Sequence, residues 1–457
     1  MKKETDVLVV GGGPVGLYFA GLLAGQGLKV LVCEKDKEEG LGNQYTIIHI
    51  FEEAFARYGL YTPVEGDEEY VRSFTTSTIR SSLNNFPKKQ ETPPIIVLKR
   101  PQFIKRIARA AVANGAEILY STSFKSPIFD ENRKIIGGRF KGPKGELEVK
   151  ARLVADASGI PSVVRSGLPE DYGIENFKIT GEDSFYVLLH YIKLKNPEQD
   201  RITVNKTWVH YKAWLAPSLD EGMAIAGIGA NLSVDYASRC YERFKALGYL
   251  PDHEFDRLEV GGTPYRRPPY TFVADNFIAL GSAAAISNPW TGEGVIFGWM
   301  LSKIGGEVIA SVLKEKKYPS QDDLWEINYR YYQENGAEFA KNLAMLAGAT
   351  DCNEKENDYE FEKSIIYEDV DDPNKGKGLM IKLIKGVLAG KLRLTTVLKL
   401  IDAAGKGGKI YRHYKKYPSA RDGFTKWKKK ADRLWSKTSS MAERAKADYG
   451  KMLRSEG

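Results

Sequence analysis

The order of apolar and polar positions along the chain predicts strands that alternate with helices. Val7 to Val10 is an apolar run of strand length, and small and apolar residues follow at helical spacing from Leu17 to Gln26. Lys29 to Cys33 is predicted as a second strand. The elements predicted next are a helix at 45–58, a strand at 95–98, an amphipathic helix at 102–113, a hairpin that turns at 142–145 and a strand at 153–157. This alternation is typical of an α/β fold with a parallel sheet.

The second half of the chain changes pattern more than once. The elements expected there are strands at 185–194, 207–215 and 222–228, helices at 233–247 and 295–313, a strand at 277–280 and an acidic loop at 351–374. We therefore expect an α/β domain that is interrupted by a β-rich lobe and followed by a helical, basic region. The predicted segments are 1–170 and 266–318 for the α/β domain, 171–265 for the lobe and 319–457 for the C-terminal region.

Three glycines follow the first strand at the spacing of a phosphate-binding turn. Gly11 permits the tight turn, Gly13 lets the backbone approach a pyrophosphate, and Gly16 allows helix and strand to pack closely. Glu34 ends the second strand about 20 residues further on, where a carboxylate accepts hydrogen bonds from a ribose. A glycine-rich turn without a ligand is the alternative. The complete strand–helix–strand context favours a dinucleotide site.

Length and cysteine content limit the class of protein. With 457 residues, the chain is expected to form two or three lobes. Its three cysteines, Cys33, Cys240 and Cys352, are isolated, which argues against a disulfide framework or a zinc site and fits a reducing cytosol. No apolar run is read as long enough to span a bilayer, and the N-terminus enters the first strand at once, so no signal peptide is expected. We therefore expect a cytoplasmic location.

Two features before residue 170 resemble a known family. Arg100 stands where a strand ends and a helix begins, and the segment DASGIPSVVR carries Asp156, Gly159, Ser162 and Arg165. Both resemble the flavoprotein family typified by p-hydroxybenzoate hydroxylase and geranylgeranyl reductase. The resemblance implies a Rossmann-like FAD-binding domain, in which Arg100 contacts the cofactor. A plain surface charge is the alternative for this arginine.

The segment from Phe272 to Gly294 resembles the second flavin motif of the same family. Its sequence, FVADNFIALGSAAAISNPWTGEG, ends in the family's N-P-x-T-G-x-G pattern, but Ser282 replaces the usual aspartate on the ribityl chain. A hydroxyl hydrogen-bonds there without a charge. The resemblance implies FAD as the cofactor. The residues assigned to it are Gly11, Gly13, Pro14, Gly16, Glu34, Lys35, Arg100, Asp156, Gly281, Ser282, Pro289, Gly292 and Gly294.

Aromatic residues in the predicted lobe indicate a substrate pocket. The geranylgeranyl reductases carry Tyr-x-Trp-x-Phe-Pro here, and this chain matches only Trp214 and Pro217, with Lys212 at the tyrosine position. The same two residues fit the Trp-x-Trp-x-Ile-Pro segment of flavin-dependent halogenases. The residues assigned to substrate are His210, Tyr211, Trp214 and Trp290. Ordinary packing within the sheet is the alternative.

The C-terminal region concentrates positive charge. From Lys375 to Lys416 it holds twelve Lys or Arg residues and the single acid Asp402, with apolar residues between them at helical spacing. Such a segment suits an anionic membrane surface, so a peripheral position at the inner face of the membrane stays open. A solvated basic helix is the alternative, and nucleic acid is not expected because no recognition motif accompanies the charge.

Together these features predict an FAD-dependent oxidoreductase. The NPWTGEG segment is closer to the reductase group, so the expected reaction is reduction of carbon–carbon double bonds in an apolar isoprenoid or lipid-like substrate. A flavin-dependent monooxygenase or halogenase acting on an aromatic compound is one alternative, and an electron-transfer flavoprotein that feeds quinone is another. Because the sequence has one nucleotide fingerprint, a ferredoxin or a briefly bound NAD(P)H is expected as electron donor. The pattern identifies no catalytic residue, and His210 and Tyr211 are proton-donor candidates by position alone.

Overall fold

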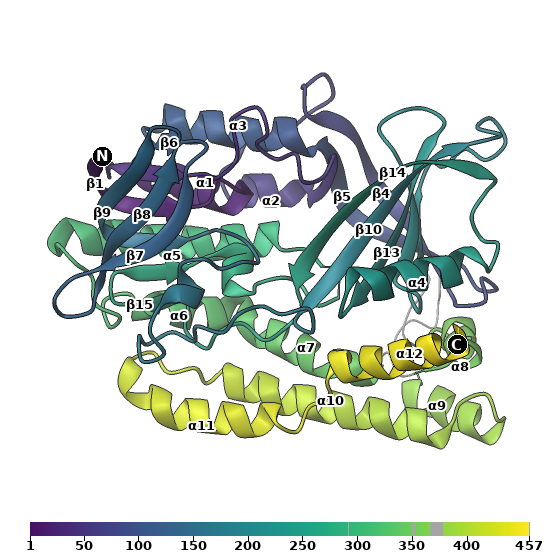
Figure 1. Cartoon of the computed structure of the whole chain (residues 1–457). Coiled ribbons are helices and arrows are strands. Elements are labelled where there is room, and N and C mark those ends of the chain that lie inside the picture. The colour runs from purple at the N-terminus through teal and green to yellow at the C-terminus, as the bar shows by residue number, and fades with distance from the viewer. Residues whose placement is uncertain (291, 350–351, 366–377, 457) are drawn as a thin grey trace.

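The computed structural model describes residues 1–290, 292–349, 352–365 and 378–456, and places helices around two large sheets (Figure 1). The first sheet has the strand order β15-β16-β9-β1-β2-β6, and β8 and β7 continue from β9. Its strands are β1 (Lys2–Val10), β2 (Val30–Cys33), β6 (Glu117–Leu119), β7 (Ser123–Phe129), β8 (Ile135–Gly142), β9 (Gly145–Asp156), β15 (Val273–Ala274) and β16 (Phe277–Ala279).

The centre of this sheet is parallel and buried. β1 pairs in parallel with β2 and with β9, and Val7 lies opposite Val30 and Leu153. Such strands read as continuous apolar runs because helices cover both faces of the sheet. The helices that flank it are α1 (Pro14–Ala24), α3 (Arg100–Ala113) and α5 (Val295–Glu315). The predicted Rossmann-like α/β fold is confirmed, and it directs the ends of β1, β2 and β9 toward one edge.

The second sheet forms the β-rich lobe, in the order β14-β10-β13-β12-β11-β4-β5-β3. Its strands are β3 (Ile47–Phe51), β4 (Tyr70–Arg80), β5 (Lys88–Lys99), β10 (Ser184–Leu194), β11 (Asn205–Trp208), β12 (Ala213–Pro217), β13 (Met223–Asn231) and β14 (His253–Pro264). The helix α4 (Val234–Lys245) packs against β10 and β13. Three strands of the lobe, β3, β4 and β5, thus come from the range 1–170, which was predicted to belong wholly to the α/β domain.

Helices make up most of the described C-terminal region. They are α6 (Trp325–Tyr331), a π-helical turn (Tyr332–Gly336), α7 (Ala337–Ala349), α8 (Glu354–Glu362), α9 (Leu379–Leu388), α10 (Leu394–Tyr414), α11 (Phe424–Trp435) and α12 (Met441–Glu456). α10 runs along α7, and Tyr414, Tyr417 and Trp427 pack around Tyr332. The last helix, α12, returns to the lobe, where Ala445 and Met452 join its apolar core.

Within the described residues, α5 is the one helix long and apolar enough to cross a membrane, and 61% of its most apolar window is buried inside the protein. It packs against α1 and α6 as a core helix.

Two predicted elements have a different structure. The predicted helix at 45–58 is the strand β3 followed by the short helix α2 (Glu52–Arg57), because Ile47–Phe51 pairs with β5 at the edge of the second sheet. Pairing with a distant strand thus outweighs the local pattern that favours a helix. The strand predicted at 207–215 is the hairpin β11–β12, and the left-handed Lys212 (φ 49°) stands at its turn. The prediction of one continuous strand at 207–215 is therefore wrong.

The predicted acidic loop at 351–374 is also wrong where the structure describes it. Residues Glu354–Glu362 form α8, whose start carries a capping box between Asn353 and Glu356. Glu356 is buried and also accepts hydrogen bonds from Arg393 and Thr396. The rest of that predicted loop, 366–374, and the start of the basic region, 375–377, lie outside the described residues, as do Thr291 and residues 350–351.

Candidate functional site

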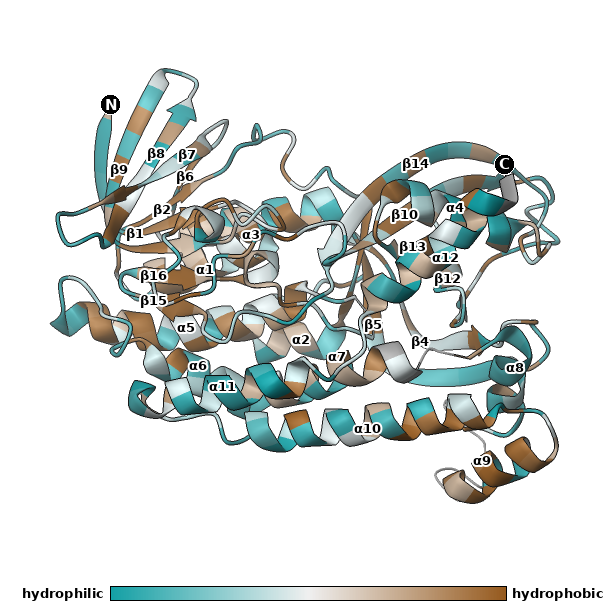
Figure 2. Cartoon of the chain, turned by 60° about the horizontal axis from the view of Figure 1, so that its bottom comes forward, coloured by the Kyte–Doolittle hydropathy of each residue, from teal (hydrophilic) through white to brown (hydrophobic). Residues whose placement is uncertain are grey.

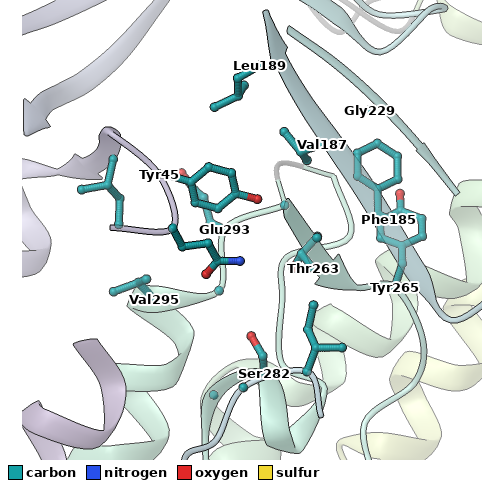
Figure 3. Close-up of a pocket in the computed structure, with 18 of the residues that line it drawn as sticks. Tyr45, Phe185, Val187, Leu189, Gly229, Thr263, Tyr265, Ser282, Glu293 and Val295 are labelled. Atoms are coloured by element: carbon teal, nitrogen blue, oxygen red, sulfur yellow. The ribbon is translucent and has the colours of Figure 1, made fainter. Parts of the chain in front are cut away.

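A cavity of about 2350 Å³ lies between the two sheets. One part is lined by the turns after β1 and β2 and by the N-terminal ends of α1 and α5, and another by β10–β13, α8 and α12. Figure 3 shows the middle of this cavity, where side chains of β10 in the second sheet lie opposite Ser282, Glu293 and Val295 of the second glycine motif and α5. Pockets for one ligand typically have volumes of roughly 300–1,000 Å³. The cavity therefore has room for a large cofactor and a second molecule together.

The first glycine turn has the geometry of a phosphate-binding loop. A Cβ on Gly11 would lie 2.5 Å from the Ala157 carbonyl oxygen, and one on Gly16 would lie 2.3 Å from the Gly11 carbonyl oxygen, so both positions exclude a side chain. A Cβ on Gly13 would meet no protein atom within 4 Å. Gly13 also precedes α1, whose N-terminus has no side-chain cap. Its free amide groups favour a negatively charged group in this space.

Glu34 holds the turn from the side of the second strand. Its carboxylate accepts hydrogen bonds from the amide groups of Gly12 (2.5 Å) and Asp36 (2.8 Å), and the side chain is buried. Lys35 also lines the cavity but is exposed, and its ammonium group donates to Asp36. Two amide partners leave lone pairs on the Glu34 oxygens that can accept ribose hydroxyls.

Replacing Glu34 by glutamine is expected to weaken FAD binding by roughly 1–3 kcal/mol, the cost of leaving a buried partner unsatisfied. The amide NH₂ group of glutamine would face an amide N–H instead of accepting from it. Titration of the apoprotein with FAD, followed by flavin fluorescence, measures the effect. An unchanged dissociation constant would show that Glu34 does not support the cofactor.

The second glycine motif meets the first across the cavity. Gly281–Ala284 forms a short 3-10 turn in which Gly281 and Ser282 line the space, followed by Pro289, Gly292 and Gly294. Gly294 begins α5 without a side-chain cap. The segment is anchored from the lobe, because the Tyr265 hydroxyl donates to the Pro289 carbonyl oxygen (2.6 Å) and that of Thr263 to the Ser287 hydroxyl (2.6 Å). Two uncapped helix ends thus open into one cavity.

Asp156 does not line this cavity, which corrects its assignment to the cofactor. It is fully buried, and its carboxylate accepts hydrogen bonds from Ser158 and from the amide groups of Val164 and Arg165. Arg165 in turn donates to the Ala283 carbonyl oxygen (2.7 Å). Asp156 therefore organises the loop after β9 and connects it to the 3-10 turn of the second motif.

Arg100 lies at the start of α3 and lines the cavity. Its guanidinium group donates to the Gly42 carbonyl oxygen and lies 5.7 Å from the centre of the Tyr45 ring. Burial lowers its pKa from the ordinary arginine value. It anchors the segment 40–45 over the cavity, and contact with the cofactor stays a prediction.

The four residues assigned to substrate all line the cavity but differ in environment. Trp214 is half-buried and packs over Gly227, where a Cβ would lie 2.0 Å from its indole ring, and Trp290 is exposed. The Tyr211 hydroxyl donates to Glu354 of α8, and the His210 Nδ1 atom lies 3.9 Å from the Cys352 sulfur. Burial lowers the pKa of His210, so its imidazole is neutral near pH 7. His210 and Tyr211 therefore contact the C-terminal region.

Several residues of the cavity wall were not predicted from the sequence. They include Phe185, Val187 and Leu189 on β10, and Tyr45 and Tyr265 in the segments beside β3 and β14, all labelled in Figure 3. They carry no motif, and their positions depend on strand pairings between distant segments. For α8, the Asn353–Glu356 capping box was a usable signal.

Comparisons with known proteins agree with this geometry. Residues 4–213 match the model of an FAD binding domain. The chain is 25% identical to digeranylgeranylglycerophospholipid reductase of Sulfolobus acidocaldarius, over 95% of this chain and 98% of that protein. It is 28% identical to digeranylgeranylglycerophospholipid reductase 2 of Methanopyrus kandleri, over 71% and 82%. The crystal structure of a geranylgeranyl bacteriochlorophyll reductase-like protein from Thermoplasma acidophilum superposes with a TM-score of 0.70 at 19% identity, over 88% and 100%.

The open space at Gly13 and the two uncapped helix ends fit a dinucleotide that carries a pyrophosphate and an electron-poor ring system. With the matched domain, they define the protein as an FAD-binding flavoprotein and an oxidoreductase. Its sequence is similar to digeranylgeranylglycerophospholipid reductases, and its fold to that of a geranylgeranyl bacteriochlorophyll reductase-like protein. The predictions of family, fold class and cofactor are confirmed.

Proposed function

We propose that the protein reduces carbon–carbon double bonds in the prenyl chains of a lipid. The observation that carries the proposal is the continuity of the cavity from the two glycine motifs to the apolar wall formed by Val187, Leu189, Trp214 and Ile225. An isoprenoid chain suits such a wall because it is apolar along its length. Relatives aligned over most of the chain are named as reductases of a geranylgeranyl lipid.

The chain's own residues would divide the work by position. The α1 N-terminus and Gly13 would hold the pyrophosphate of FAD, and Glu34 its ribose. The α5 N-terminus would face the flavin ring and stabilise negative charge on it. When bound, FAD supplies the hydride. The side chains of β10, β12 and β13 would orient the prenyl chain and exclude water.

This function is tested by mixing photoreduced holoenzyme with a digeranylgeranylglycerol lipid in the absence of oxygen. We expect the flavin absorbance near 450 nm to return as the lipid accepts electrons, and a fully saturated lipid of the same headgroup to leave the flavin reduced. Reoxidation by both lipids, or by neither, would contradict the proposal.

Replacing Trp214 by alanine is expected to lower kcat/KM about 10- to 100-fold, since the lost apolar contact is worth roughly 1.5–3 kcal/mol. Flavin content should not change. Trp208 on the same hairpin is the contrast, because it packs against Phe244 in the lobe core and does not line the cavity. Its replacement by alanine should instead lower the melting temperature. An equal loss of stability in both variants would make Trp214 a packing residue.

We also propose that the surface formed by α9 and the first half of α10 contacts an anionic membrane. This docking face consists of the exposed residues Leu379, Met380, Ile381, Ile384, Leu388, Leu394, Leu398 and Ile401. Leu388 is 82% exposed, and Figure 2 shows α9 as an apolar helix at the edge of the molecule. Lys385 and Lys391 are exposed among these side chains. Apolar side chains interleaved with lysines match an interface of apolar chains and anionic headgroups.

Not every cation of the basic region is available for this contact. Arg393 pairs with the buried Glu356, and the Lys382 ammonium group donates to the Ser364 carbonyl oxygen. Both hold α8 against α9 and α10.

For the supply of electrons to the flavin, we propose a transient donor, a ferredoxin or a briefly bound NAD(P)H. The described residues contain one dinucleotide-type glycine turn, at Gly11–Gly16.

A further inference from the structure

Lys212 has a backbone conformation that few lysines adopt. It stands at the turn of the β11–β12 hairpin with a φ of 49°, in the left-handed region. A non-glycine residue held there is strained and persists only where the surroundings fix it. Here its amide group donates to the Val209 carbonyl oxygen (3.2 Å), and its carbonyl oxygen accepts from the Gly229 amide group (3.0 Å). The turn therefore fixes a lysine in the cavity wall.

Two aromatic rings flank the Lys212 side chain. The ammonium nitrogen lies 4.6 Å from the centre of the Phe185 ring and 5.1 Å from that of Tyr265. Phe185 lies against Gly229, where a Cβ would come within 2.1 Å of the ring, and Figure 3 shows the Phe185 and Tyr265 rings at this part of the wall. Because Tyr265 also bonds to the Pro289 carbonyl oxygen, the ammonium group is one side chain away from the second glycine motif.

Among the described residues, the Lys212 ammonium group has no negative partner. Within the described part of the chain, no carboxylate lies within ion-pair distance of it, and the charge that acts on it most is the cation Arg444 of α12. Burial, and then Arg444, lower its pKa to about 7. An uncompensated charge in such a place is costly, and the cost falls when an anion binds. Lys212 and Arg444 thus place two cations in the cavity wall.

We propose that Lys212 binds the anionic group, a phosphate or carboxylate, of an amphiphilic substrate inside the cavity. The inference rests on the proposed function, since it adds a charged group to the prenyl lipid. It makes Lys212 a specificity-determining residue that selects anionic over neutral prenyl compounds. A charge-assisted hydrogen bond to the ammonium group would hold the head of the substrate, and the apolar wall would hold its chain.

The test compares two ligands that share one chain, geranylgeranyl phosphate and geranylgeraniol, by calorimetric titration of the FAD-loaded protein. We expect the phosphate to bind about 10- to 100-fold more tightly than the alcohol, the range of a hydrogen bond to a charged group. Lys212→Met should remove this preference and leave binding of the alcohol unchanged. Lys206→Met is the matched control, because Lys206 lies on β11 of the same hairpin but does not line the cavity. Lys212→Gln provides a polar substitute if the methionine variant does not fold.

The outcomes distinguish a failure of the Lys212 inference from a failure of the proposed function. Equal affinity for both ligands, or a preference that survives in Lys212→Met, would overturn the inference and leave the proposed function intact. Failure of both prenyl ligands to bind would overturn the proposed function and the inference with it. Inorganic phosphate alone should bind far more weakly than geranylgeranyl phosphate. Equal binding of inorganic phosphate that is lost in Lys212→Met would indicate a site for free phosphate, and would overturn the assignment to the substrate.

Discussion

Replacing Gly13 by valine is expected to yield a folded protein that binds FAD much more weakly. The Gly13 backbone is extended (φ −73°, ψ 173°), which a valine adopts without strain, and its Cβ would meet no protein atom within 4 Å. The added side chain would therefore occupy only the space in front of the α1 N-terminus. Overpacking of a filled site costs typically 1–3 kcal/mol, so FAD affinity should fall about 10- to 100-fold.

The measurement is the ratio of absorbance at 450 and 280 nm in the purified variant, together with its FAD dissociation constant. Gly13→Ala is the graded control and should lose less flavin. Gly16→Val is the structural contrast: its Cβ would clash with the Gly11 carbonyl oxygen at 2.3 Å, so folding itself should fail. Full flavin occupancy in a folded Gly13→Val variant would mean that the pyrophosphate binds elsewhere.

Substitutions on the docking face are expected to have the largest effect on membrane binding. Replacing Ile384 and Leu388 by serine removes two exposed apolar side chains that an interface would bury, each worth roughly 1.5–3 kcal/mol. Partition onto vesicles should fall by about 100-fold or more. Reversing Lys385 and Lys391 to glutamate should remove the preference for anionic lipid, because each cation near such a surface contributes about 1 kcal/mol, and this contribution fades in high salt.

Vesicle co-sedimentation with anionic and neutral lipids across a salt series measures both effects. The apolar control is Val112→Ser with Leu258→Ser, which are exposed on α3 and β14. The charge control reverses Lys429 and Lys430, exposed on α11. Binding that is absent at low salt, or that the controls reduce as much as the test variants, would leave α9 and α10 as a face without a lipid partner.

The first glycine motif was predictable because its requirements are local. Each of Gly11, Gly13 and Gly16 has a separate steric role within a few residues of the chain, and the structure places all three as the spacing implies. The second motif was recognisable for the same reason, and Ser282 lines the cavity where the family pattern predicts a ligand of the cofactor. Whether each assigned residue touches FAD stays a prediction.

The parts that were not predictable depend on distant pairings. β3 forms because Ile47–Phe51 meets β5, and nothing local distinguishes it from a helix. Asp156 belongs to the family pattern, but only the structure shows that its carboxylate accepts hydrogen bonds from the loop at 158–165. The position of Lys212 depends on a left-handed turn that a lysine rarely adopts, so the sequence predicted one strand at 207–215 where the structure has a hairpin.

The central claim is that this cavity serves the reduction of prenyl double bonds. It is tested most directly by mass spectrometry of a digeranylgeranylglycerol lipid after anaerobic incubation with the holoenzyme and a chemical reductant. We expect products heavier than the substrate by the mass of two hydrogen atoms for each double bond reduced, and much less product with the Gly13→Val variant. A lipid of unchanged mass with fully flavin-loaded protein, or a product that appears only with oxygen and carries an added oxygen atom, would contradict it.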